Sequence, residues 1–250
     1  MVSMQPRPFP SRSLVAAGIG VVVIVCGLAA LGVWQLQRLA WKTDLIARVE
    51  ARVHAAPVPA PGRAQWPAVN RDDDEYRRVA LGGTFLHDRE TLVQAVTELG
   101  AGYWVLTPLD DGNGMVTLVN RGFVPTDRRT PATRAAGQVA GRVTITGLMR
   151  MSEPGGAFLR SNDPDGDRWY SRDIAAIAQA RGLDGAAPYF IDADAGADPA
   201  GYPRGGLTRL TFPNSHLVYA LTWFAMAAVA AGMFAAFVRH LRREHGAARG

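Results

Sequence analysis

The sequence predicts a membrane protein in which two transmembrane helices flank one extracytoplasmic α+β domain, with mainly antiparallel strands. Two uncharged stretches predict the helices, one between Arg12 and Arg38 and one between Arg209 and Arg239. The residues between these stretches form strand-like blocks separated by glycine-rich turns, which predicts the domain. The expected order is a cytoplasmic N-terminus (1–13), a transmembrane helix (14–36), the extracytoplasmic domain (37–213), a second transmembrane helix (214–238) and a basic cytoplasmic tail (239–250).

Both uncharged stretches are long enough to cross a bilayer. A helix needs about 20 apolar residues to span a hydrocarbon layer roughly 30 Å thick, and each charge at its centre costs about 2.5 to 3.5 kcal/mol. The first stretch could instead be a signal peptide, because Arg7 and Arg12 precede it. Its apolar part is longer than a signal peptide usually carries, and it runs into Trp34 and Gln35 without a small-residue cleavage site. We therefore expect this helix to be retained.

Basic residues next to the second helix predict the orientation. The tail after Val238 contains one acidic residue, Glu244, and four arginines, at positions 239, 242, 243 and 249. This excess of basic residues predicts that the tail lies in the cytoplasm. Two crossings place the N-terminus there as well. The formal net charge of +5 is mostly explained by these terminal arginines, and it gives little reason to expect nucleic-acid binding.

Residue usage points to a bacterial protein, and together with the predicted topology this places it in the inner (plasma) membrane with its large domain in the periplasm. Lys42 is the only lysine, and arginine, alanine and glycine are abundant, which is typical of a GC-rich bacterial genome. The single cysteine, Cys26, lies within the first apolar stretch. Neither a disulfide nor a two-thiolate metal site can therefore form within one chain.

The domain is expected to begin with helix and continue as strands. An apolar stripe at Trp41, Leu45, Ile46 and Val49 predicts that the first helix extends beyond the membrane until prolines 57, 59 and 61 interrupt it. Val-, Thr-, Tyr- and Leu-rich blocks predict strands at 76–86, 91–96, 103–109, 115–124, 142–149 and 189–192. Asp173 as N-cap and Gly182 at the other end bracket one short predicted helix.

The clusters of polar residues in the domain are better explained by turns than by metal-binding or catalytic sites. The acidic residues 72–75 are expected to form a solvated turn, with a calcium site as the alternative. Residues 163–174 fail as an EF-hand loop, because the glycine comes too early and position twelve is Ile174. His87 to Glu90 predict a hairpin turn. The known nucleophilic, zinc-hydrolytic and nucleotide-binding motifs do not occur, so nothing in the sequence favours an enzyme.

The start of the second helix carries the residues most suited to binding a ligand. At 100° per residue, Tyr219 and Trp223 lie within about 60° of His216, and Ala220, Ala227 and Ala231 lie near the same direction. Trp34, Gln35, Arg38 and Trp41 reach the same membrane depth from the first helix. Such a set can bind a planar, anionic iron compound, with His216 on the metal, aromatic rings on the plane and Arg38 on a carboxylate. An ordinary interfacial belt of Trp and Tyr is the alternative.

At these residues the sequence resembles the surfeit locus protein 1 family of cytochrome c oxidase assembly factors. The resemblance covers nearly the whole chain in order. It is carried by LGVWQLQRLAWK (31–42), GTFLHDRETLV (83–93), GYWVLTPL (102–109), VNRGFVP (119–125), RWYSRD (168–173), PYFID (188–192) and NSHLVYALTWF (214–224).

The resemblance implies a non-enzymatic role in building haem-copper cytochrome c oxidase, by binding haem a as cargo and assisting its insertion into subunit I. It places the family's haem-associated histidine on His216 and implies oxidase subunit I, and the haem a synthesis enzymes, as partners. The competing functions are a scaffold or chaperone for subunit I that works without haem, a sensor and a membrane-tethered hydrolase. The short tail after Val238 disfavours the sensor, and the missing catalytic motifs disfavour the hydrolase. The role of VNRGFVP is left open, with a strand ending at a glycine bend as its simplest structure.

Overall fold

The computed structural model describes residues 11–157, 159–196, 201–208, 210 and 212–247. The chain divides into two compact units, a helical unit (residues 1–47 and 211–250) and a barrel unit (residues 48–210). Most of the predicted N-terminal segment 1–13, and Arg249 of the predicted tail, lie outside the described residues.

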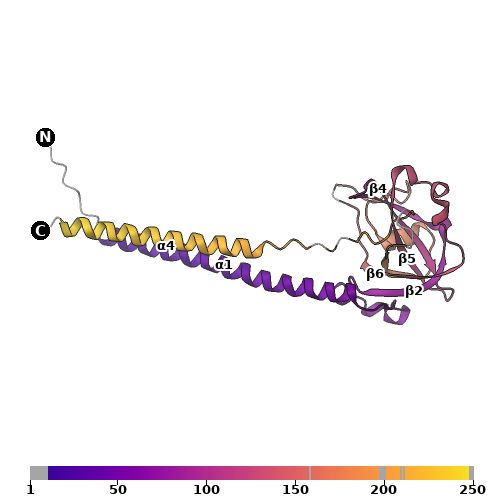
Figure 1. Cartoon of the computed structure of the whole chain (residues 1–250), viewed down its shortest axis with the longest axis horizontal. Coiled ribbons are helices and arrows are strands. Elements are labelled where there is room, and N and C mark those ends of the chain that lie inside the picture. Colours follow the sequence, from indigo (N-terminus) through magenta and orange to yellow (C-terminus); the bar gives the residue numbers. More distant parts are fainter. Residues whose placement is uncertain (1–10, 158, 197–200, 209, 211, 248–250) are drawn as a thin grey trace. The chain divides into compact units, whose positions relative to one another are not determined.

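Two long helices and a group of short elements make up the fold (Figure 1). The long helices are α1 (Ser11–His54) and α4 (His216–Ala247). The strands are β1 (Val58–Pro59), β2 (Arg78–Phe85), β3 (Thr91–Thr97), β4 (Gly100–Asp110), β5 (Val116–Pro125), β6 (Arg142–Met151) and β7 (Ala186–Ala193). The short helices are η1 (Arg63–Ala68), α2 (Arg71–Asp74), η2 (His87–Arg89), η3 (Thr126–Arg128), η4 (Pro131–Gly137) and α3 (Ile174–Ala180).

The helical unit consists of α1 and α4 packed side by side in opposite directions (Figure 1). Contacts along the pair occur in reverse sequence order. Lys42 Nζ donates to the carbonyl of Pro213, and Gln35 is hydrogen-bonded to His216. Further along the pair, a Cβ on Gly32 would touch the Phe224 ring, and a Cβ on Gly18 would touch the Phe234 ring. Over residues 12–54 and 216–244 both helices are long and apolar enough to cross a membrane. The predicted extension of the first helix is confirmed, because α1 continues without a break to His54.

The barrel unit is built on a seven-stranded sheet in the order β1-β2-β6-β7-β5-β4-β3. A further pairing joins β2 to β4 through Thr84 with Asp110 and Phe85 with Leu109, so the sheet closes on itself. The β1–β2 and β5–β7 pairs are parallel, and the other pairs are antiparallel. The prediction of an antiparallel α+β unit is thus confirmed as a β-rich domain but corrected in topology: the sheet is mixed and forms a closed barrel.

Two apolar clusters hold the barrel unit together. One draws side chains from every strand of the closed ring and fills its interior, with Val79, Leu109, Val119, Met149 and Tyr189 as members. The other lies on the outer side of the same strands, where Ile174 and Ile177 of α3 pack on Leu118 and Phe190. Each fully buried isoleucine contributes about 1.5 to 3 kcal/mol. The predicted α3 is confirmed, since the Asp173 carboxylate accepts from the Ala176 N–H at 3.2 Å.

Two predicted turns differ from the structure. The segment expected as a hairpin turn is η2, and the strands on either side of it pair with β4 rather than with each other. The acidic turn is the short helix α2, capped by Asn70, and its last carboxylates are not solvated. Asp74 and Glu75 are buried and paired with Arg77 and Arg150, respectively. Among the described residues, no three His, Cys, Asp or Glu side chains gather as metal ligands.

Candidate functional site

The helix-pair site comprises Gln35 and Arg38 of α1 with His216, Tyr219 and Trp223 of α4. His216 is the first residue of α4 and lies half-buried against α1. Its Nδ1 is 2.8 Å from Oε1 of Gln35, a residue 181 positions away in sequence. In the part of the chain that the structure describes, His216 Nε2 has no hydrogen-bond partner. The imidazole is thus held from one side and has a nitrogen lone pair available on the other.

The small residues of α4 pack within the helix pair. Ala220 and Ala227 are 1% and 7% exposed, and they follow His216 along the face of α4 that meets α1. Ala231 is exposed. Of the two uses that small residues allow, close approach of a flat ligand or of another helix, the structure shows the second for Ala220 and Ala227. At Ala220 and Ala227 a planar ligand therefore cannot lie against the backbone of α4, because α1 already does.

The two predicted aromatic residues differ in placement. Trp223 is half-buried, as His216 is, whereas Tyr219 is 56% exposed and lies on the flank of the contact face. Exposed rings on α1 accompany it, at Trp34 and Trp41. This end of the pair therefore presents apolar rings outside the contact with α1, where a flat molecule could stack.

Arg38 lies at the same end of the helix pair as His216. It falls on α1 between Gln35, which contacts His216, and Lys42, which contacts Pro213. Its guanidinium carbon is 4.5 Å from the centre of the Trp41 ring, and the side chain is exposed. Lys42 is a second cation at this level that sequence reasoning left out of the site. Its position relative to His216 depends on helix pairing, which only a structure reveals.

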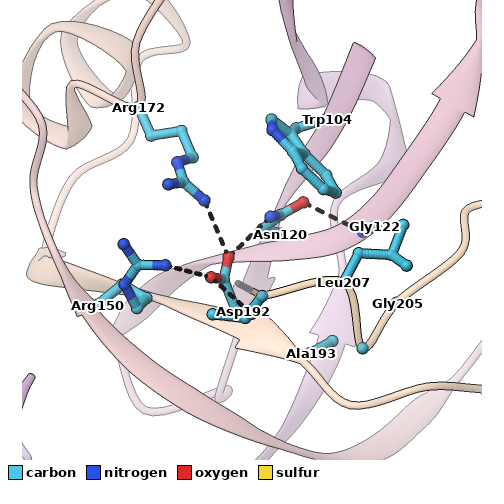
Figure 2. Close-up of a pocket in the computed structure, with 11 residues that line it drawn as sticks. Trp104, Asn120, Gly122, Arg150, Arg172, Asp192, Ala193, Gly205 and Leu207 are labelled. Carbon is cyan, nitrogen blue, oxygen red and sulfur yellow. Dashed lines mark hydrogen bonds and ion pairs between the residues drawn. The ribbon is translucent and has the colours of Figure 1, made fainter. Parts of the chain in front are cut away.

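The barrel unit contains a separate polar cavity of about 210 Å³ (Figure 2). Asn120 of β5, Arg150 of β6 and Asp192 of β7 line it from adjacent strands, and Arg172 reaches in from a loop. Trp104 and Leu207 form its apolar side (Figure 2). Sequence reasoning did not identify this cavity, because its residues are scattered over more than half of the domain.

Asp192 is the centre of the cavity's hydrogen-bond network. Its carboxylate is 4% exposed and accepts from Arg150 Nη1 at 2.7 Å, Arg172 Nη1 at 3.2 Å, Asn120 Nδ2 at 2.7 Å and Thr208 Oγ1 at 3.0 Å. Burial acts to lower the pKa of Arg150, but Asp192 and Glu75 outweigh it and raise that pKa above its ordinary value. The charges are thus matched within the protein, and the cavity is best described as a structural ion-pair network.

The strap, residues 201–208, crosses the barrel beside VNRGFVP. Phe123 N–H donates to the Arg204 carbonyl at 2.8 Å, and Arg204 N–H donates back at 2.9 Å. Gly122 has φ +125° and lies directly under Arg204, with no room for a Cβ. The strand does not end at this glycine: β5 continues to Pro125 across an irregular register with β4. The backbone of VNRGFVP therefore holds the strap in place through hydrogen bonds and close packing.

Comparison with known proteins identifies the family. The SURF1 family matches this chain over residues 22–228, from within α1 to within α4. The chain belongs to the SURF1 family. The matched range includes both halves of the helix-pair site as well as the whole barrel unit, and the resemblance found in the sequence is confirmed.

Individual SURF1 relatives match most of the chain. Surfeit locus protein 1 of Rattus norvegicus is 39% identical over 226 residues, which cover 84% of this chain and 72% of the relative. The Xenopus tropicalis protein of the same name is 36% identical over 243 residues, covering 90% and 76%. A SURF1-like protein of Monosiga brevicollis is 39% identical over 241 residues, covering 91% and 87%.

Proposed function

We propose that this chain is a membrane-anchored assembly factor for haem-copper cytochrome c oxidase that binds haem a and assists its insertion into subunit I. Family membership supports the role in oxidase assembly through the resemblance described above. The observation that carries haem binding is the half-buried His216 at one end of the helix pair, with Nδ1 engaged by Gln35 and Nε2 free. Imidazole nitrogen is a common axial ligand of haem iron. The proposed role is carriage, without catalysis.

The residues around His216 fit the chemistry of a haem. Trp223 and Tyr219 supply aromatic surface for the ring, and Arg38 is an exposed cation at the same end of the pair for a propionate. A charge-assisted bond of this kind contributes about 1 to 3 kcal/mol when it is partly solvated. Because Ala220 and Ala227 are covered by α1, the proposed binding surface is the exposed flank that carries Tyr219.

The proposed location is the bacterial inner membrane, crossed by α1 and α4, with the barrel unit in the periplasm and both ends of the chain in the cytoplasm. Its support is the length and apolar character of both helices and the arginines that follow Val238. Reporter fusions after residue 150 and after residue 250 test this orientation. A reporter that is active only in the periplasm when placed after residue 250 would overturn it.

The competing function is a haem-independent scaffold for subunit I, and one observation favours it. Ala220 and Ala227 of α4 are buried in the contact with α1, so this part of the face needs no ligand to explain it. The visible spectrum of the detergent-purified full chain, co-expressed with haem a synthesis enzymes, separates the two functions. A haem a spectrum supports the carrier, and a haem-free protein that still binds subunit I supports the scaffold.

A further inference from the structure

The hydrogen bond between His216 and Gln35 determines which imidazole nitrogen is free to bind a metal. An amide oxygen carries no hydrogen and can only accept, so the 2.8 Å contact requires a proton on His216 Nδ1. A neutral imidazole with its proton on Nδ1 has its lone pair on Nε2. Histidines that bind metals usually donate their other N–H to an oxygen in this way, which fixes the tautomer and the orientation of the ring.

Gln35 is held at this position by contacts on either side of it along α1. Gly32, one turn earlier, is buried, and a Cβ there would lie 2.7 Å from the Phe224 ring. Lys42, two turns later, bonds to the carbonyl of Pro213. Positions 32, 35 and 42 follow the helical repeat and share one face of α1, so Gln35 faces α4 by the packing of its own helix.

We propose that Gln35 is a positioning residue that fixes the Nδ1-protonated tautomer of His216 and directs Nε2 toward the iron of haem a. This inference rests on the proposed haem binding. It goes further by assigning a role in the ligand's electronic character to a neutral residue on the other helix. By accepting a hydrogen bond from Nδ1, the amide oxygen keeps the proton on that nitrogen. The same bond fixes the orientation of the imidazole ring.

Another glutamine on the same helix provides a matched control. Gln37 is two residues from Gln35, and because residues two apart point in different directions on a helix, it does not share the face that meets α4. It is exposed. The variants Gln35→Leu and Gln37→Leu therefore make the same chemical change at nearly the same depth, and only the first removes the acceptor for His216 Nδ1.

The test uses the full chain in detergent, loaded with haem a by co-expression, in wild type and in the variants Gln35→Leu, Gln35→Glu, Gln37→Leu and His216→Ala. Three properties are measured: the visible spectrum, the rate of haem loss to a haem-scavenging globin, and the reduction potential of the iron. Gln35→Leu is expected to release haem 10- to 100-fold faster, as is usual when an outer partner of a metal ligand is removed. Gln37→Leu is expected to match wild type.

Gln35→Glu keeps the acceptor and the shape while adding negative charge. It is expected to retain haem and to shift the iron to a lower reduction potential, because a carboxylate makes the imidazole a stronger electron donor. A residue with a purely structural role would not move the potential in this variant. The Glu variant also keeps the test decisive if the Leu variant fails to insert.

The outcomes separate this inference from the proposed function. If His216→Ala alters the haem spectrum, while both Gln35 variants match wild type in haem loss and potential, the positioning role is wrong and the haem site stands. If His216→Ala also leaves the spectrum unchanged, the proposed haem site itself is wrong.

Discussion

A Cβ atom on Gly122 would lie 1.9 Å from the carbonyl oxygen of Arg204. This contact joins VNRGFVP to the strap, and two backbone hydrogen bonds between Phe123 and Arg204 reinforce it. The glycine is needed for two reasons, the close approach and its φ of +125°.

Gly122→Ala is expected to destabilise the barrel unit by displacing the strap. Gly100→Ala is the matched control, because Gly100 also has a positive φ of +100° but nothing within 4 Å of its Cβ position. The free energy of unfolding should fall by about 1 to 3 kcal/mol more in the Gly122 variant than in the control, because the added methyl group overpacks the contact. Thermal unfolding of the full chain in detergent, followed by near-ultraviolet circular dichroism, measures the difference. Equal losses of stability in the two variants would show that the strap moves to accommodate the methyl group without destabilising the barrel unit.

The Asp192 network is expected to be the largest single polar contribution to the barrel. Asp192→Ala removes the buried carboxylate that Arg150 and Arg172 share, although Glu75 and Glu153 still pair with them, and should cost about 3 kcal/mol. Asp163→Ala breaks the exposed pair with Arg168 and one hydrogen bond from the Gly166 N–H, and should cost clearly less than Asp192→Ala. Chemical denaturation of both variants is the measurement. A small loss for Asp192→Ala would show that water or another carboxylate replaces it.

Tyr189 is expected to make the barrel sensitive to alkali. Burial, with a contribution from the charge of Asp74, raises the pKa of its hydroxyl to about 12, although the neighbouring polar groups of Trp66 and Thr117 act in the opposite direction. Because the fold favours the neutral phenol, this stabilisation is complete below pH 10 and is lost as pH rises toward 12. The loss amounts to about 3 kcal/mol.

Tyr189→Phe isolates this effect from other groups that titrate in alkali. At pH 8 the variant should lose about 1 kcal/mol, because the 2.7 Å bond from the hydroxyl to the Pro61 carbonyl is gone. Between pH 10 and 12 its free energy of unfolding should fall less steeply than that of wild type. Identical slopes would mean that folding does not raise the pKa of this phenol.

The strands could be predicted from sequence because their signals are local. Val- and Thr-rich blocks bounded by glycines located six of the strands, and the N-cap Asp173 located α3. Barrel closure could not be predicted, because the β2–β4 pair and the parallel β5–β7 pair depend on contacts between distant segments. The burial of Glu75 could not be predicted for the same reason, since its partner Arg150 lies far along the chain.

The sequence predicts which residues of the helix-pair site share a face of one helix, but not which of them contact the other helix. A helical wheel groups Tyr219 with His216, but the direction of α1 decides which side is covered, and Tyr219 falls outside it. The sequence predicts that Gln35 lies near the start of α4, and the structure has it in contact with His216. Its bond to His216 depends on the packing of α1 against α4, which periodicity does not specify.

The packing of the helix pair around Gly32 is expected to tolerate little added volume. Gly32→Ala brings a methyl group to 2.7 Å from the Phe224 ring, whereas Gly20→Ala meets nothing within 4 Å. Overpacking should cost the first variant about 1 to 3 kcal/mol, and the second should be neutral or slightly stabilised. The melting temperature of the full chain in detergent reports both. Recovery in the double variant Gly32→Ala with Phe224→Leu would confirm the contact, and no change on Gly32→Ala would contradict it.

Haem a content per chain tests the proposed site most directly, with His216→Ala compared with wild type and with His240→Ala. His240 is an exposed histidine near the other end of α4, so its variant controls for loss of a histidine from the same helix. After co-expression with haem a synthesis enzymes and purification in detergent, wild type and His240→Ala should carry haem a with the same spectrum. His216→Ala should lose most of it while still inserting and folding. Equal haem content and an unchanged spectrum in His216→Ala would contradict the assignment of His216 as the iron ligand.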